Sequence, residues 1–303
     1  MTVANDITGL IGATPLVRIN RLTGPEDSTI YAKLEWFNIG GSVKDRLGLY
    51  LFEHAESAAR LTRDRVILEA TSGNTGIALA MIAAAKGYRI ALVMPESVSV
   101  ERRKIIKAYG ADLILTTGAK GTAGAIEHKQ ELLRESPEKY TDLDQFRDPA
   151  NILAHYQTTG KEILEQTRGR LDAVVVGIGT AGTGVGTSMR VKQELPDAKV
   201  IGVTPKLGVS IQGLRNPGEP FPTQLFRGQW FDEVVEIGNE GREETFKVAR
   251  EAAKKEGLLV GMSAGAILYV ALKKARELGR GRTIVAILPD GGERYLSTSL
   301  YED

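Results

Sequence analysis

Short β-rich runs alternate with longer helical patterns along most of this 303-residue chain, and this alternation constrains its fold more than any other feature. A β-rich run at 66–71 precedes a helical pattern at 74–87, and another at 89–95 precedes one at 99–110. Such alternation is typical of parallel strands joined by crossover helices. It resumes after a break at 145–151, so we predict an α/β protein with two lobes, each a mostly parallel twisted sheet flanked by helices.

Composition narrows the range of partners. The chain has 39 basic and 38 acidic residues scattered along it, so no basic face predicts binding to nucleic acid or to an anionic membrane. It has no cysteine, and its three histidines share no metal-ligand spacing, so we predict no metal site. No secretory leader and no apolar stretch of about 18 residues is visible, which indicates a cytoplasmic protein with small-molecule substrates.

A glycine-rich segment at 177–182 follows an apolar strand pattern and precedes a helical one. Its G-x-G-x-x-G spacing occurs in dinucleotide sites, but those sites need an acidic residue after the next strand, where this chain has Thr204 and Pro205. Two interpretations remain: a simple tight turn, or a cup of N–H groups and hydroxyls that binds a monophosphate at a helix N-terminus. The cup would comprise Gly179, Thr180, Ala181, Gly182 and Thr183.

A second polar loop, TSGNTG at 71–76, lies between a predicted strand and a predicted helix. One such side chain would suffice to cap the helix. Four polar side chains in six positions favour a loop that binds a carboxylate or phosphate.

Lys44 stands near the start of a third predicted helix, where the helix dipole disfavours a positive charge. Most lysines are simply solvated. A lysine whose ammonium form is disfavoured is also what Schiff-base chemistry uses, because the neutral amine is the nucleophile. This segment alone leaves both interpretations of Lys44 open.

Eight motifs follow one another along nearly the whole chain. They are IGATPLVRI (11–19), KLEWFNIGGSVKDR (33–46), EATSGNTGIALA (69–80), MPESVSVERRKIIKAYGA (94–111), QFRDPAN (145–151), GIGTAGTGVG (177–186), GMSAGA (261–266) and LPDGGERYLST (288–298). Together they closely resemble the cysteine synthase family, which belongs to the tryptophan-synthase-β-like, fold type II, pyridoxal-phosphate enzymes. The resemblance implies a smaller, mobile substrate-binding lobe at 36–149. It also implies a larger lobe, from 10–35 and 150–303, that binds the cofactor in the cleft between the two.

The resemblance also implies roles for individual residues. Lys44 would hold pyridoxal 5'-phosphate covalently and move the substrate's α-proton, and the cup at 179–183 would bind the cofactor's phosphate. Asn74 would bind the ring hydroxyl, and Ser263 would lie opposite the pyridine nitrogen, which a serine leaves neutral. Residues around the substrate carboxylate would be Thr71, Ser72, Thr75 and Gln145.

The implied reaction is replacement of the β-substituent of an activated serine by sulfide, giving L-cysteine. Arg215 lies in a Leu-Arg-Asn context that binds the phosphate of O-phosphoserine in some relatives, which favours that substrate slightly over O-acetylserine. A solvated loop arginine is the alternative. Ile39 and Gly40 depart from the family's usual Asn-Pro, which loosens the predicted approach to Lys44 without changing the reaction class.

Three other functions compete with this prediction. A cystathionine β-synthase has similar motifs and would use homocysteine, whereas a serine or threonine dehydratase typically has Asn-His where this chain has Asn74-Thr75. A binding module without activity is disfavoured because Lys44, Asn74 and Ser263 are all present. The family is commonly homodimeric, so we expect a homodimer. The sequence does not choose between sulfide, thiosulfate and a sulfur-carrier protein as donor.

Overall fold

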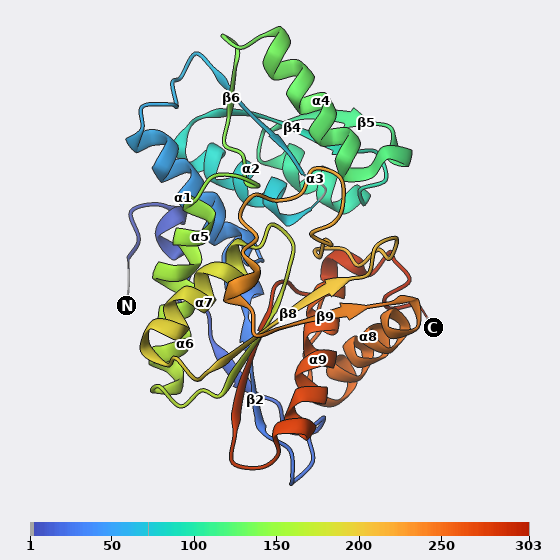
Figure 1. Ribbon diagram of the computed structural model, residues 1–303. Coiled ribbons are helices and arrows are strands. Elements are labelled where there is room, and N and C mark those ends of the chain that lie inside the picture. The colour runs from blue at the N-terminus through green and yellow to red at the C-terminus, as the bar shows by residue number, and fades with distance from the viewer. Residues whose placement is uncertain (1–2, 72, 303) are drawn as a thin grey trace.

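In the computed structural model, which describes residues 3–71 and 73–302, ten strands form two sheets that lie in separate lobes (Figure 1). The larger sheet has the strand order β1 (Leu16–Arg18), β2 (Thr29–Leu34), β10 (Thr283–Leu288), β7 (Ala173–Gly177), β8 (Lys199–Pro205) and β9 (Glu233–Ile237). The smaller sheet has the order β5 (Asp112–Thr116), β4 (Arg89–Pro95), β3 (Val66–Ala70) and β6 (Tyr140–Asp142). Neighbouring strands are parallel except for the β1–β2 pair, so the predicted fold class is confirmed.

Helices cover both sheets. They are α1 (Lys44–Ser57), α2 (Asn74–Lys86), α3 (Val100–Ala108), α4 (Gly121–Glu135), α5 (Ala150–Ala154), α6 (Gly160–Thr167), α7 (Gly182–Glu194), α8 (Asn239–Glu251) and α9 (Met262–Leu278). Two π-helical turns follow α5 and α8, at His155–Thr159 and Ala252–Glu256. Short 3-10 turns occur at Ile7–Leu10, Glu35–Phe37, Gly118–Lys120, Gly228–Trp230 and Glu293–Tyr295. No helix in the described ranges is long and apolar enough to span a bilayer.

The larger sheet is buried on both faces because successive side chains of a strand point to opposite sides. In β7, Ala173 and Val175 pack with α8 and α9, whereas Val174 and Val176 pack with α7. This two-sided burial explains why these strands are apolar throughout instead of alternating with polar residues.

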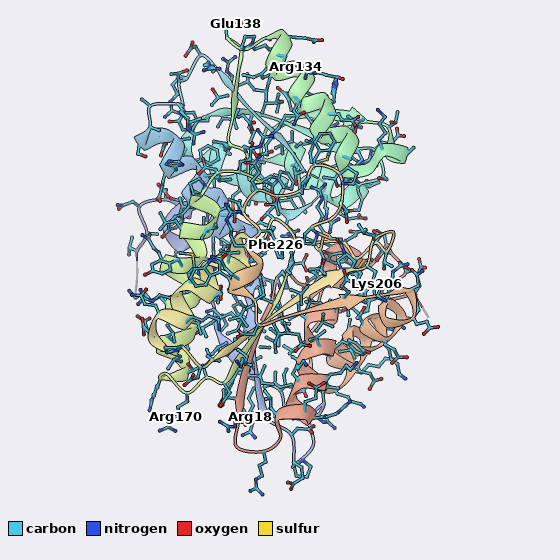
Figure 2. The ribbon with its side chains drawn as sticks, viewed as in Figure 1. Arg18, Arg134, Glu138, Arg170, Lys206 and Phe226 are labelled. Carbon is cyan, nitrogen blue, oxygen red and sulfur yellow. The ribbon has the colours of Figure 1, made fainter. Side chains whose placement is uncertain are left out.

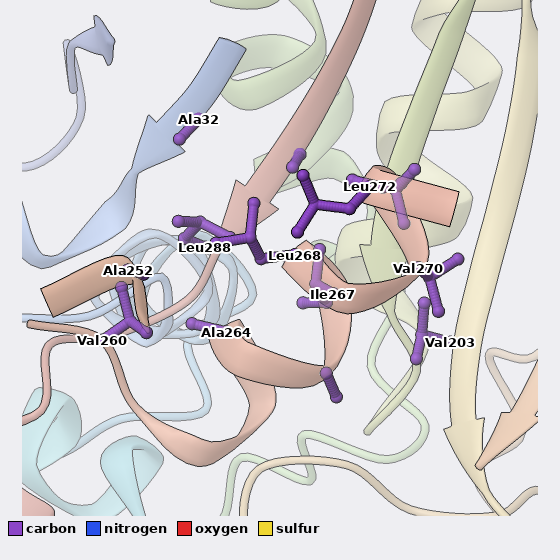
Figure 3. Close-up of a cluster of buried hydrophobic side chains, with 14 of the residues drawn as sticks. Ala32, Val203, Ala252, Val260, Ala264, Ile267, Leu268, Val270, Leu272 and Leu288 are labelled. Carbon is purple, nitrogen blue, oxygen red and sulfur yellow. The ribbon is translucent and has the colours of Figure 1, made fainter. Parts of the chain in front are cut away.

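Helix α9 supplies much of the larger lobe's core. Ile267 and Leu268 of α9 lie among side chains of three strands, represented by Ala32, Val203 and Leu288 (Figure 3). Charged side chains lie at the periphery instead, such as Glu138 and Arg134 at one end of the molecule and Arg18 and Arg170 at the other (Figure 2). The apolar centre and charged surface agree with a globular α/β core.

Helix α1 makes contacts with both lobes. Leu47 and Leu51 join the core of the smaller lobe, where a Cβ added at Gly48 would lie 2.9 Å from Ile82 of α2. The buried guanidinium of Arg46 instead faces the larger lobe. Its ion-pair partners there are Glu35, with Nε–Oε2 2.7 Å, and Glu162 of α6, with Nη1–Oε1 2.7 Å, and Glu162 also pairs with Lys33 of β2 at 2.6 Å.

Candidate active site

One enclosed cavity gathers the ends of several elements. Lys44 and Asn74 are the first residues of α1 and α2, residues 177–183 connect β7 to α7, and Ser263 lies in the first turn of α9. The residues that line the cavity are Val43, Lys44, Asn74, Val176, Gly177, Gly179, Thr180, Ala181, Thr183, Gly213, Leu214, Ser263, Ile287 and Pro289. Parallel sheets bind ligands at the carboxyl ends of their strands, and the cavity lies at the ends of β7 and β10.

The environment of Lys44 favours its neutral amine. Burial lowers the pKa of Lys44 from 10.5 to about 8, and the nearby carboxylate of Asp290 opposes this shift. Its place at the start of α1 disfavours the ammonium form further. Lys44 is therefore a candidate nucleophile and general base, and the solvated interpretation does not describe it.

The 179–183 segment fits a phosphate group. Ala181 has a φ of 71°, in the left-handed region, and α7 begins at the next residue. A Cβ added at Gly179 would lie 3.0 Å from the carbonyl oxygen of Gly213, and one at Gly182 would collide with Asn151, so both positions need glycine. The first N–H groups of a helix have no partner within the helix, so they remain available to an anion. The residues that we predicted as a phosphate cup thus have a geometry compatible with an anion, and their role stays a prediction.

Two residues that we did not predict support the hydroxyls of the cup. The Asn151 amide donates to the Thr180 hydroxyl at 2.9 Å, and the His155 Nε2 lies 3.1 Å from the Thr183 hydroxyl. Burial, together with the charges of Arg46 and Lys44, lowers the pKa of His155 well below its usual value, so His155 is neutral at pH 7. The motif at 145–151 pointed to Asn151, whereas His155 gave no signal in the sequence beyond its place in a helical pattern.

Ser263 lies beside the irregular segment that follows β8. Its side chain is buried, and a Cβ added at Gly213 would lie 2.9 Å from the Ser263 hydroxyl. Gly213 also has a φ of +94°, which favours glycine. The long segment between β8 and β9 thus contributes directly to the cavity, through Gly213 and Leu214.

The predicted carboxylate-binding residues lie next to the cavity without lining it. The Thr75 hydroxyl donates to Gln145 Oε1 at 2.8 Å, and Gln145 in turn donates to the Ala70 carbonyl at 3.1 Å. Thr71, Thr75 and Gln145 are all buried, and none of the three is among the residues lining the cavity around Lys44. Ser72, the fourth predicted residue, lies outside the described residues.

Arg215 lies away from the cavity lining. Its Nε donates to Glu219 Oε2 at 3.1 Å, its Nη2 donates to the Pro220 carbonyl, and its guanidinium stacks 5.4 Å from the centre of the Phe146 ring. Two of its three nitrogens are thus bound within its own loop, whereas Nη1 is buried without a hydrogen-bond partner among the described residues.

Other candidate sites lack these features. A cavity of about 640 Å³ lies between α4 and the loops at 142–147 and 221–224, and none of the predicted site residues lines it. Within residues 3–71 and 73–302, no group of three or more His, Cys, Asp or Glu side chains is placed to hold a metal ion.

Comparisons with known proteins agree with this geometry. Residues 7–290 match the family model described as pyridoxal-phosphate dependent enzyme. A cysteine synthase from Staphylococcus aureus is 41% identical over 309 residues, which cover 98% of this chain and 97% of that protein. The crystal structure of a cysteine synthase from Entamoeba histolytica has a TM-score of 0.92 and 40% identity, covering 100% of this chain and 92% of that one. An O-acetylserine dependent cystathionine β-synthase from Helicobacter pylori has a TM-score of 0.89 and 37% identity, covering both chains fully. The chain therefore belongs to the cysteine synthase family of pyridoxal-phosphate dependent enzymes.

Proposed function

We propose that this enzyme makes L-cysteine from O-acetyl-L-serine and sulfide, with pyridoxal phosphate bound at Lys44. The observation that carries the proposal is the meeting of Lys44, Asn74, Ser263 and the phosphate cup in one cavity. The bound cofactor would supply an electron sink for the pair released at the substrate's α-carbon.

Each residue around the cavity has a proposed task. The Lys44 amine, with its lowered pKa, holds the cofactor and afterwards removes and returns the substrate's α-proton. Asn74 binds the ring hydroxyl, and the Ser263 hydroxyl faces the ring nitrogen. The loop that contains Thr71, together with Gln145, binds the substrate carboxylate. Because Thr71 and Gln145 do not line the cavity, we propose that the lobe at 36–149 moves to bring them closer to it.

The choice of leaving group rests on charge. Among the described residues that line the cavity, Lys44 is the one cationic side chain, and Arg215 lies outside the lining, with its Nε and Nη2 bound to Glu219 and Pro220. A phosphate leaving group would need a positive partner, whereas acetate needs none before it departs. This favours O-acetylserine over O-phosphoserine. The printed name of the Helicobacter pylori relative also specifies O-acetylserine.

Three measurements test the proposal. Purified protein should bind pyridoxal phosphate and show its visible absorption, and Lys44→Ala should abolish the covalent attachment and lower turnover by at least about a thousandfold. With sulfide, kcat/KM should be higher for O-acetylserine than for O-phosphoserine, and Arg215→Ala should reduce both values equally. Replacing sulfide by homocysteine tests the cystathionine β-synthase alternative. A protein that never takes up the cofactor would refute the enzyme assignment.

We propose further that the protein works in the cytoplasm as a homodimer that takes up free sulfide. The support for the dimer is the resemblance to a commonly dimeric family. Sedimentation velocity at micromolar concentration tests it, and a single monomer peak would contradict it. Comparing sulfide with thiosulfate in the assay tests the donor.

A further inference from the structure

The side-chain amide of Asn74 is held from both sides by residues near the C-terminus. Its Nδ2 donates to Asp290 Oδ2 at 2.7 Å, and its Oδ1 accepts from Arg294 Nη1 at 2.7 Å. Reversing the amide would place a donor against the guanidinium and an acceptor against the carboxylate. The two partners therefore permit only one orientation of this amide.

The fixed orientation leaves one N–H of Asn74 available. An amide nitrogen carries two hydrogens, and Asp290 accepts one of them. Asn74 also lines the cavity that contains Lys44. We propose that Asp290 and Arg294 are positioning residues, which orient Asn74 so that its second N–H meets the ring hydroxyl of the bound cofactor. This inference rests on the role proposed for Asn74.

Asp290 is itself held rigidly. It is fully buried, and its Oδ2 also accepts from the Tyr295 hydroxyl at 2.6 Å. Its other oxygen lies where a Cβ at Gly261 would collide with it, directly before the helix that carries Ser263. A carboxylate fixed in this way can hold Asn74 without adjusting its own position, which is the requirement for an orienting partner.

Arg294 connects the same amide to the segment before Lys44. Besides Asn74, its guanidinium donates to the carbonyl of Gly40. Gly41, the next residue, has a φ of +82°, and a Cβ there would collide with the guanidinium. The absence of a side chain at Gly41 thus gives Arg294 the space to reach both Gly40 and Asn74.

The experiment compares the holoenzymes of Asp290→Ala and Arg294→Met, each alone and combined with Asn74→Ala. The readouts are the dissociation constant of the cofactor and the pH titration of its visible absorption. Each single variant should weaken cofactor binding about tenfold and shift the absorption titration, as losses of orienting partners do. In the Asn74→Ala background, the changes caused by Arg294→Met should disappear to within about twofold, because Arg294 acts through Asn74. Part of the change caused by Asp290→Ala should remain, because the charge of Asp290 also acts on Lys44.

The control is Glu293→Gln, which removes a charge from an exposed side chain in the same turn and should leave both readouts unchanged. Equal losses from Arg294→Met with and without Asn74 would overturn the inference, and so would an Arg294→Met protein that behaves like the wild type. If Asp290→Ala does not fold, Arg294→Met decides the matter alone. If Asn74→Ala itself leaves the cofactor's absorption unchanged, the role proposed for Asn74 fails instead.

Discussion

At the scale of single residues, the chemistry depends on how the fold alters Lys44. An ordinary lysine is almost wholly protonated at neutral pH, whereas a pKa of about 8 makes roughly a tenth of the amine neutral at pH 7. Two effects on the pKa of Lys44 oppose each other: burial disfavours the charged ammonium, whereas the negative charge of Asp290 favours it. Burial is the larger of the two.

This balance predicts the pH dependence of cofactor attachment. The rate at which the apoprotein takes up pyridoxal phosphate covalently should rise with pH and level off above about 8, because the neutral amine is the nucleophile. Stopped-flow absorbance between pH 6 and about 10.5 measures it. Asp290→Asn should move the midpoint to lower pH, since the opposing charge is lost. A midpoint near the ordinary lysine value of about 10.5 would contradict this account.

At the scale of elements, α7 packs unusually closely against its neighbours. A Cβ added at Gly186 would collide with the backbone carbonyl of Ile152 in α5 and would lie 2.9 Å from the Cβ of His155. His155 contacts Thr183 in the cup, so this packing also places the phosphate site. The absence of a side chain at 186 allows the two helices to approach.

Gly186→Ala should therefore destabilise the protein although alanine is the better helix former. Overpacking against a backbone costs about 1–3 kcal/mol, which exceeds the gain of up to about 1 kcal/mol in helix propensity. Thermal unfolding should show a melting temperature lower by about 2–6 °C. Gly228→Ala is the matched control, because a Cβ there has its nearest contact at 3.9 Å. A variant that melts at a higher temperature would show that propensity dominates.

Helices and strands with a strong hydrophobic period were predictable from the sequence, whereas short strands were not. Helix α2 was expected at 74–87 and occurs at Asn74–Lys86, where Gly87 ends it in the left-handed conformation. Strand β9, at Glu233–Ile237, was not predicted, because its pairing with β8 determines it. The three-residue strand β6 was likewise invisible, since tertiary pairing decides so short a run.

The candidate site likewise contains residues that the sequence predicted and residues that only the structure shows. Lys44, Asn74, Ser263 and the cup follow from motifs, and the structure brings them together. Asp290 and Arg294 lay within a quoted motif, but no spacing connects them with Asn74, more than 200 residues earlier. Only the folded chain places these groups side by side.

At the scale of the whole molecule, Arg102 joins the two lobes. It lies on α3 of the smaller lobe, donates to Gln212 at 2.7 Å and stacks 4.9 Å from the ring of Tyr295, and both of these partners belong to the larger lobe. The arginine is buried, so its contacts are protected from solvent. Two lobes were predicted from the sequence, whereas this contact between them was not.

Arg102→Ala should loosen the contact between the lobes. We expect faster amide hydrogen exchange in α3 and a raised KM for the amino-acid substrate, because the carboxylate-binding loop belongs to the same lobe. Lys104→Ala, at an exposed position of the same helix, serves as control. Unchanged exchange in α3 would show that Arg102 does not hold the lobes together.

The charge cluster around Arg46 fastens the start of α1 to the larger lobe. Arg46 is fastened to Glu35 and Glu162, while the rest of α1 packs into the smaller lobe. In the lobe movement proposed above, the first turn of α1 would therefore be the pivot. Points near a pivot travel least, and Lys44 is two residues from Arg46, so its amine would keep its position while the far end of the helix swings. Such a movement would enclose a substrate without displacing the group that reacts with it.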